Sequence, residues 1–90
     1  MPTIRIPTPL KPYTRGDGLA TVQGATVAEA LQDLLRQHPG LRLHLFNPQG
    51  RLRPYMNIFV DDEHIRDLQG LDTPLTADSQ IKILPAIAGG

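Results

Sequence analysis

The sequence predicts an α+β fold in which one main helix covers a mixed sheet of four or five strands. The helix is expected over residues 26–38, where a capping motif precedes an amphipathic pattern. Segments in which apolar residues alternate flank it, in the order strand, strand, helix, strand, short strand, strand. The compact arrangement that fits this order is a β-grasp, in which the first and last strands lie side by side in parallel.

Composition narrows the classes of function. The chain has 90 residues, enough for one small domain, and nine basic residues balance nine acidic ones. Aromatic residues make up only 4%, so no nucleic-acid partner is expected. Without cysteine there are no disulfides, thiolate metal ligands or cysteine nucleophile. Because no apolar run reaches the roughly 18 residues of a membrane span and the N-terminus lacks a signal-peptide pattern, we expect a cytoplasmic protein with no membrane partner.

The first two strands are predicted as a hairpin. Residues 3–6 alternate polar and apolar side chains, and Pro7 and Pro9 end this strand because proline cannot donate to a ladder. Residues 10–18 are rich in turn-forming residues and are expected to be the hairpin connection. Residues 19–23 form the expected returning strand.

The strongest local pattern is that of helix 26–38. Thr26 and Glu29 form a capping box, in which the Thr26 hydroxyl accepts from the Glu29 N–H and the carboxylate reaches back. Pro39 and Gly40 are expected to end the helix. Its predicted buried face consists of Val27, Ala30, Leu31, Leu34 and Leu35.

The segment 41–53 leaves two alternatives open. Leu41, Leu43 and Leu45 alternate as in a strand, but a helical turn accounts for them equally well. Residues 47–50 are predicted to form a turn.

The second half is predicted to be mostly strands and turns. Residues 54–60 alternate and form a strand, and the tight turn 61–62 leads into a short return over 63–66. Residues 68–76 are expected to be a loop or a single helical turn. Residues 77–80 then turn the chain into the last strand.

The C-terminal stretch divides into a strand and a tail. Residues 81–85 alternate, as in a strand whose two faces see different surroundings. We therefore expect a β-grasp domain over residues 1–85 and a flexible tail over residues 86–90. Gly89 and Gly90 have no Cβ atom and would fit a narrow channel, which suits a carboxylate handed to another protein. A frayed terminus without function is the alternative.

Taken together, these features resemble the ubiquitin-like sulfur-carrier proteins of the MoaD/ThiS family. The helix and strand order agrees over essentially the whole chain, and residues 60–66, 77–80 and 81–90 carry the likeness. The CysO branch, which serves cysteine biosynthesis, is the most similar one. That similarity lies in Pro39-Gly40-Leu41-Arg42, Gly50-Arg51-Leu52-Arg53, Asn57-Ile58-Phe59-Val60 and the Ala-Ile-Ala-Gly-Gly ending.

The resemblance implies a carrier that is not itself an enzyme and binds no cofactor. A partner adenylyltransferase of the ubiquitin-activating-like class would use ATP to convert the Gly90 carboxylate to an acyl-adenylate. A sulfur donor would then displace AMP and leave a thiocarboxylate. Gly90 carries the chemistry and Gly89 provides clearance. In the CysO branch, the thiocarboxylate attacks an activated serine derivative on a PLP-dependent cysteine synthase, and a metalloprotease releases the product.

Partners of this kind are expected to bind the exposed face of the sheet and the root of the tail. For Phe59 and Leu84, the alternative is that these side chains pack in the core. For Arg51 and Arg53, the favoured interpretation is that they lie in a solvated turn. The predicted contact residues are Tyr55, Phe59, Leu84, Ile87 and Ala88, with Arg51 and Arg53 at the rim.

Other chemistry has less support in the sequence. His38, His44 and His64 are too widely spaced for a local metal motif, and the acidic run 61–63 lacks the glycine and spacing of a calcium loop. No metal site is therefore predicted. The alternative functions are a permanent small subunit of a molybdopterin-synthase-like complex, a carrier for thiamine or tRNA thiolation, and a β-grasp interaction module whose tail is never modified.

Overall fold

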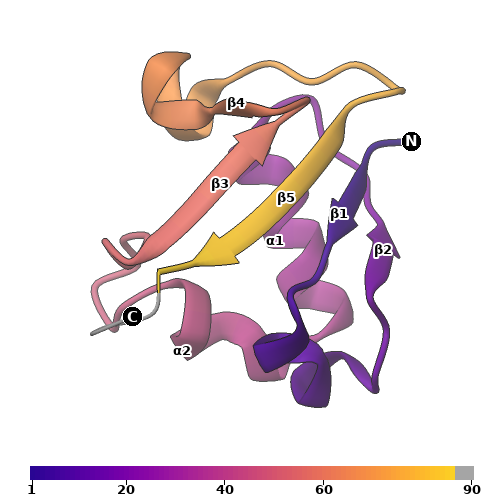
Figure 1. Cartoon of the computed structure of the whole chain (residues 1–90), viewed down its shortest axis with the longest axis vertical. Coiled ribbons are helices and arrows are strands. Elements are labelled where there is room, and N and C mark those ends of the chain that lie inside the picture. Colours follow the sequence, from indigo (N-terminus) through magenta and orange to yellow (C-terminus); the bar gives the residue numbers. More distant parts are fainter. Residues whose placement is uncertain (87–90) are drawn as a thin grey trace.

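The structure, a computed structural model, describes residues 1–86 of the chain, and the predicted tail residues 87–90 lie outside the described part. Five strands form one sheet in the order β2-β1-β5-β3-β4 (Figure 1). β1 and β5 are parallel, and the other neighbours are antiparallel. The last strand therefore lies at the centre of the sheet, which confirms the predicted ubiquitin-like β-grasp. The strands are β1 (Thr3–Arg5), β2 (Leu19–Thr21), β3 (Met56–Val60), β4 (Glu63–His64) and β5 (Gln80–Pro85).

One long helix lies behind the sheet in Figure 1, and several short helical segments connect the strands. In residues 1–86 no helix is both long and apolar enough to cross a membrane. The helices are α1 (Val27–Gln37) and α2 (Arg42–Leu45), together with the 3-10 helices η1 (Thr8–Thr14), η2 (Pro39–Leu41), η3 (Ile65–Asp67) and η4 (Gly70–Asp72).

The two faces of the sheet have different surroundings. Because side chains alternate along a strand, each strand contributes to both faces. We call the face that packs into the core with α1 the closed face; its buried residues are Ile4, Ala20, Met56, Ile58, Val60, Ile81 and Ile83. We call the other the open face, formed by Arg5, Leu19, Asn57, Phe59, Lys82 and Leu84.

The predicted helix is confirmed, including its caps. The Thr26 Oγ1 accepts a hydrogen bond from the Glu29 N–H at 3.2 Å, and the Glu29 carboxylate accepts from the Ala25 N–H at 3.0 Å, one residue before the N-cap. All five residues of the predicted apolar face are buried. A Cβ atom on Gly24 would lie 2.6 Å from the Ala30 nitrogen, so only glycine allows the chain to enter the helix this closely.

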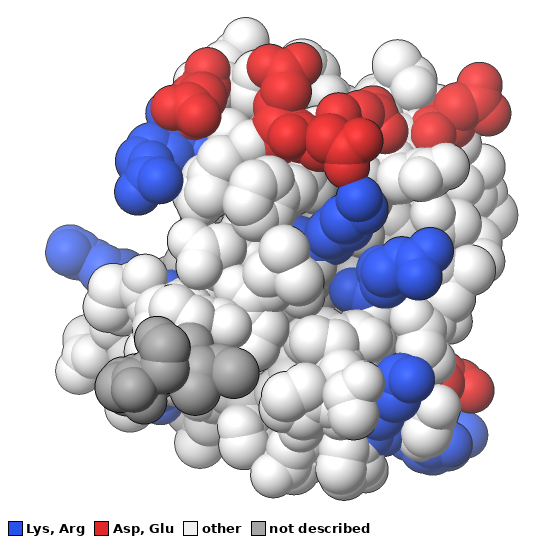
Figure 2. All heavy atoms as spheres, viewed as in Figure 1, with Lys and Arg blue, Asp and Glu red and all other residues white. Residues whose placement is uncertain are grey.

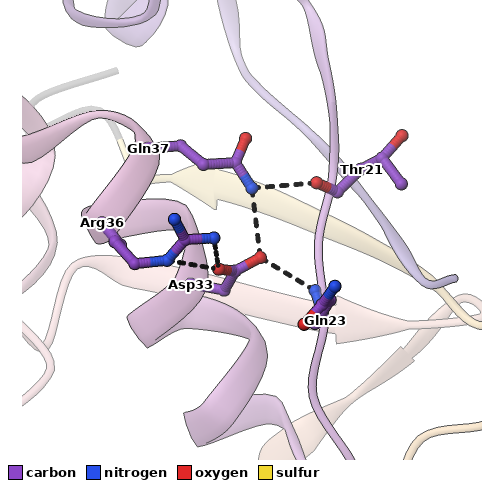
Figure 3. Close-up of polar contacts among 5 residues, drawn as sticks. All are labelled: Thr21, Gln23, Asp33, Arg36 and Gln37. Carbon is purple, nitrogen blue, oxygen red and sulfur yellow. Dashed lines mark hydrogen bonds and ion pairs between the residues drawn. The ribbon is translucent and has the colours of Figure 1, made fainter.

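Asp33 ties α1 to the edge of the sheet (Figure 3). Its carboxylate accepts a hydrogen bond from the Gln23 N–H at 2.9 Å and pairs with Arg36. Gln37 donates both to this carboxylate and to the Thr21 carbonyl. The hydrogen bonds from Gln23 and Arg36 hold the pKa of Asp33 below its ordinary value.

The segment 10–18 connects the antiparallel strands β1 and β2, as predicted for a hairpin, but most of it forms the 3-10 helix η1. Pro9 stands in its first turn, where a missing N–H costs nothing, and the Leu10 N–H bonds to the Pro7 carbonyl at 2.9 Å. Leu10 is buried, and so is Thr14, whose hydroxyl bonds to the Asp17 carbonyl at 2.7 Å. A segment with many turn residues thus forms an ordered helix because two of its side chains reach the core.

The segment after α1 takes the helical alternative. Leu41 and Leu45, four residues apart on one helical face, are fully buried, whereas Leu43 is 57% exposed. A strand would have put all three leucines on the same face. The predicted turn at 47–50 is confirmed by the Gly50 N–H, which bonds to the Asn47 carbonyl at 2.8 Å.

After β3 only the return strand is shorter than predicted, whereas the turn 61–62 is confirmed. β4 has only two residues, because the rest of the expected return continues as the helical turn η3. The segment 68–76 contains the single helical turn η4, one of the two alternatives for it. The turn between β3 and β4 consists of Asp61 and Asp62, both at positive φ, which aspartate tolerates better than most residues.

Candidate functional site on the open face and tail root

Three of the predicted partner-contact residues come together at the open face. Phe59 on β3 lies opposite Lys82, and Leu84 on β5 lies opposite Asn57. Leu84 is 48% exposed and Phe59 is half-buried, so the alternative that they pack in the core is wrong for Leu84. Tyr55, directly before β3, is also exposed. The face therefore offers apolar and aromatic side chains beside the strand that leads to the tail.

The root of the tail is fixed to the sheet. β5 pairs with β1 on one side and with β3 on the other. The Ala86 N–H then donates to the Tyr55 carbonyl at 2.7 Å, which extends the β3–β5 ladder by one bond. The remaining predicted site residues, Ile87, Ala88, Gly89 and Gly90, lie outside the described residues.

The two predicted rim arginines have different surroundings. Both lie in the segment before β3, and because Met56 pairs with Pro85 this segment is at the same end of the sheet as the tail root. Arg51 is exposed in the turn that Asn47 holds. Arg53 is half-buried, and its Nε donates to the Leu43 carbonyl at 2.7 Å, which holds the segment against α2. Of the two, Arg51 is more open to a partner.

His64 organises one side of the open face. Its Nδ1 accepts from the Arg66 N–H at 2.9 Å, so Nε2 carries the proton and donates to the Asn57 Oδ1 at 3.0 Å. The ring also meets the Phe59 ring edge-on, with centroids 5.0 Å apart. His64 therefore holds Asn57 and Phe59 in place, a role that its lone position in the sequence did not indicate.

Charges are unevenly distributed on this face. Figure 2 shows acidic residues gathered at the end of the sheet where β3 turns into β4, and basic residues across its middle. Lys82 is paired with Asp62 at 2.6 Å, and this hydrogen bond lowers the pKa of Asp62. Arg5 stands beside Lys82 in the parallel ladder. Sequence reasoning did not single out either cation, although the alternation within each strand and the predicted parallel pairing together place them side by side.

The histidines and acidic residues do not converge on a cation site in residues 1–86. His38 ends α1, and the His44 ring stacks on Tyr13 with centroids 4.0 Å apart.

Comparison with known proteins identifies the family. Residues 4–90 match the ThiS family. The chain belongs to this family. It is 37% identical to the sulfur carrier protein CysO of Mycobacterium tuberculosis over 90 residues, which cover 98% of this chain and 97% of CysO. It is 30% identical to a putative sulfur carrier protein of Archaeoglobus fulgidus over 88 residues, 97% of this chain and 96% of that protein.

Solved structures agree with this assignment. The chain superimposes on a protein from the crystal structure of the Amycolatopsis orientalis BexX/CysO complex with a TM-score of 0.91, at 34% identity and complete coverage of both chains. Membership of a family of small carrier proteins confirms that the chain is not itself an enzyme.

Proposed function

We propose that the chain is a sulfur carrier whose Gly90 carboxylate is adenylated by a partner enzyme and converted to a thiocarboxylate, with cysteine biosynthesis as the destination of the sulfur. The observation that carries the proposal is the 37% identity to CysO over 98% of this chain, together with a family match that extends to residue 90. Activation consumes ATP, which is consistent with the cytoplasmic location expected from the sequence. The carrier itself is proposed to hold no cofactor.

The proposed chemistry explains why a carrier needs a separate activating enzyme. The carboxylate at Gly90 is ionised at neutral pH and is a poor electrophile. Attack of its oxygen on the α-phosphate of ATP releases pyrophosphate and forms an acyl-adenylate. A sulfide donor then attacks the acyl carbon, the C–O bond to AMP breaks, and the thiocarboxylate remains. The proposed acceptor is a PLP-dependent synthase holding an activated serine derivative, after which a metalloprotease releases the product.

The geometry of β5 supports delivery of the tail to such a site. Ala86 is tied to Tyr55, and Leu84 is exposed two residues earlier. The Gly90 position is four residues beyond Ala86, a distance of at most about 14 Å when the chain is fully extended. A partner that takes the Gly90 carboxylate must therefore contact the surface around Leu84, Tyr55 and Arg51.

Mass spectrometry of the chain after incubation with ATP, sulfide and its cognate activating enzyme tests the proposal. We expect a mass gain equal to replacement of one oxygen by sulfur, localised to Gly90 by fragmentation. Localisation is needed because oxidation of Met1 or Met56 changes the mass by nearly the same amount. The native protein is measured first, since the proposal requires that the mature chain ends at Gly90.

The matched control is the same chain without Gly90. If the full chain gains sulfur at Gly90 and the shortened one does not, the carrier proposal stands. If the carboxylate stays unmodified with its cognate activating enzyme, the chain is an interaction module and the proposal fails. A permanent subunit is distinguished by hydrodynamics, since a carrier that moves between enzymes must be a stable monomer on its own.

A further inference from the structure

A groove runs along the open face on the β1 side of β5. Its volume is about 550 Å³, and it combines cationic with apolar side chains. It begins near the N-terminal strand and reaches Leu84, two residues before the tail root. The side chains that matter for the argument are those of Arg5, Lys11, Lys82, Pro7, Leu19 and Leu84.

The cations in this groove are only partly compensated. Arg5 and Lys82 are paired positions of neighbouring strands, an arrangement that places like charges side by side and costs stability. Within residues 1–86, Lys82 has one acidic partner, Asp62, whereas the side chains of Arg5 and Lys11 make neither a hydrogen bond nor an ion pair. The chain has as many acidic as basic residues, so this concentration of positive charge is local.

Lys11 is held close to the groove by its neighbours. Its carbonyl accepts from the Gly16 N–H at 2.9 Å, which fixes its backbone in the middle of η1. Its side chain lies over Gly18, where an added Cβ atom would be 3.1 Å from the Lys11 Cε. Glycine at this position therefore leaves room for the lysine stem to lie along the groove.

The apolar rim indicates what kind of anion fits. Leu19 is 56% exposed, and with the half-exposed Leu84 it presents apolar surface next to the cations. A small inorganic anion would meet the charges but leave these leucines in water. A polypeptide with carboxylates beside an apolar side chain satisfies both, which is the usual composition of a protein interface with a charged rim.

We propose that this groove docks an acidic segment of the activating enzyme, with its carboxylates facing Arg5, Lys11 and Lys82 and an apolar side chain packed against Leu19 and Leu84. The inference rests on the proposed function, because it requires an enzyme that takes the tail. Its location supports this choice of occupant, since β5 both lines the groove and leads directly to the tail root.

In this arrangement Asp62 competes with the carboxylates of the partner for the Lys82 ammonium. It lies in the exposed β3–β4 turn and holds the Lys82 ammonium in the free chain. Partner carboxylates would replace Asp62 on Lys82 during docking. Removing the Asp62 charge should therefore strengthen partner binding, whereas removing a groove cation should weaken it.

The test measures adenylation of the full chain by its cognate activating enzyme, followed as pyrophosphate release at varied carrier concentration. For Arg5→Glu and Lys82→Glu we expect KM to rise about tenfold with kcat unchanged, because docking rather than chemistry is affected. Arg5→Gln and Lys82→Gln should show smaller increases in the same direction.

Asp62→Asn, which keeps a side chain that tolerates positive φ, should lower KM about twofold. The matched control Arg42→Glu reverses an exposed charge on α2, outside the groove, and should leave KM unchanged.

Salt dependence and self-association provide independent outcomes. The KM of the unaltered chain should rise with ionic strength, and Arg5→Glu should flatten that dependence.

If Arg5→Glu changes KM no more than Arg42→Glu, the docking proposal is wrong, although adenylation at Gly90 stands. If the unaltered chain is not adenylated at all, the proposed function fails first. If light scattering shows a dimer that Arg5→Glu abolishes without changing KM, the groove is a contact between two copies and the proposal is overturned.

Discussion

The closed and open faces of the sheet are built from the same strands but have opposite surroundings. In β5, Ile81 and Ile83 are each 1% exposed against α1, while Lys82 and Leu84 between and after them face outward. The closed face is uniformly apolar. The open face mixes aromatic, cationic and amide side chains and has no covering element among residues 1–86.

Because of this difference, residues of the closed face determine stability, and their immediate neighbours in the same strands, on the open face, are free to serve recognition. Burial of apolar area on one face stabilises the fold, and a small domain has little stability to spare. The open face therefore tolerates adjacent cations and an exposed leucine only because the closed face supplies the packing. The same substitution at neighbouring residues of one strand should consequently change the free energy of unfolding by very different amounts.

The largest predicted effect is on the closed face. Ile83→Ala removes a buried side chain paired with Ile58 and should lower the free energy of unfolding by about 2–5 kcal/mol. Leu84→Ala, one residue away, should lower it by less than about 0.5 kcal/mol. Urea unfolding of both variants measures the contrast. Equal losses would show that the open face is also covered in solution.

A second, smaller effect concerns the contact that holds α1 against the sheet edge. The Asp33 side chain is only 10% exposed and accepts from the Gln23 N–H, so Asp33→Ala should cost about 1–2 kcal/mol at neutral pH. Asp67→Ala, an exposed aspartate without a hydrogen-bonded carboxylate among residues 1–86, is the matched control.

The same variant has a predicted pH dependence. The pKa of Asp33 in the folded chain lies below its ordinary value of 3.8. Its contribution to stability is therefore fully present above pH 3.8 and is lost as the pH falls through the lowered folded-state pKa. Unfolding curves of the unaltered chain and Asp33→Ala should converge at strongly acid pH. A constant difference between them down to that range would contradict the assignment.

A third effect tests the start of α1. Thr26→Ala removes the hydroxyl that accepts from the Glu29 N–H and should cost about 1 kcal/mol. Thr26→Ser keeps the hydroxyl and should retain most of the stability. Thermal unfolding of the pair decides whether the cap or the threonine methyl group matters. If both variants lose the same amount, the hydroxyl is not what stabilises the helix.

Much of this architecture was predictable from sequence because the relevant patterns are local. The capping box and the five apolar positions of α1 define its face without tertiary information. The alternation in β3 and β5 likewise predicts which side chains face outward, and Phe59 and Leu84 were found in this way. Pairing of the first strand with the last then follows from the order of elements.

Other features depended on contacts that the sequence does not display. Leu41, Leu43 and Leu45 fit a strand and a helix equally, and only burial of Leu41 and Leu45 on one side decides for a helix. The proline-rich segment 8–14 becomes helical because Leu10 and Thr14 reach the core. The pairing of Arg5 with Lys82 depends on the register between β1 and β5, which the alternation within each strand does not specify.

The smallest predicted effect lies outside both faces, at Arg15 after η1. Arg15 has a φ of 58°, a left-handed conformation that is costly for a residue with a Cβ atom. Arg15→Gly should therefore raise the free energy of unfolding by about 0.5–1 kcal/mol, whereas Arg42→Gly, at the start of α2 with a φ of −51°, should lower it by a similar amount. Chemical denaturation of the two variants measures the difference in sign. Because Arg15 does not line the groove, Arg15→Gly should leave the KM for adenylation unchanged, so that stability rises while recognition stays constant.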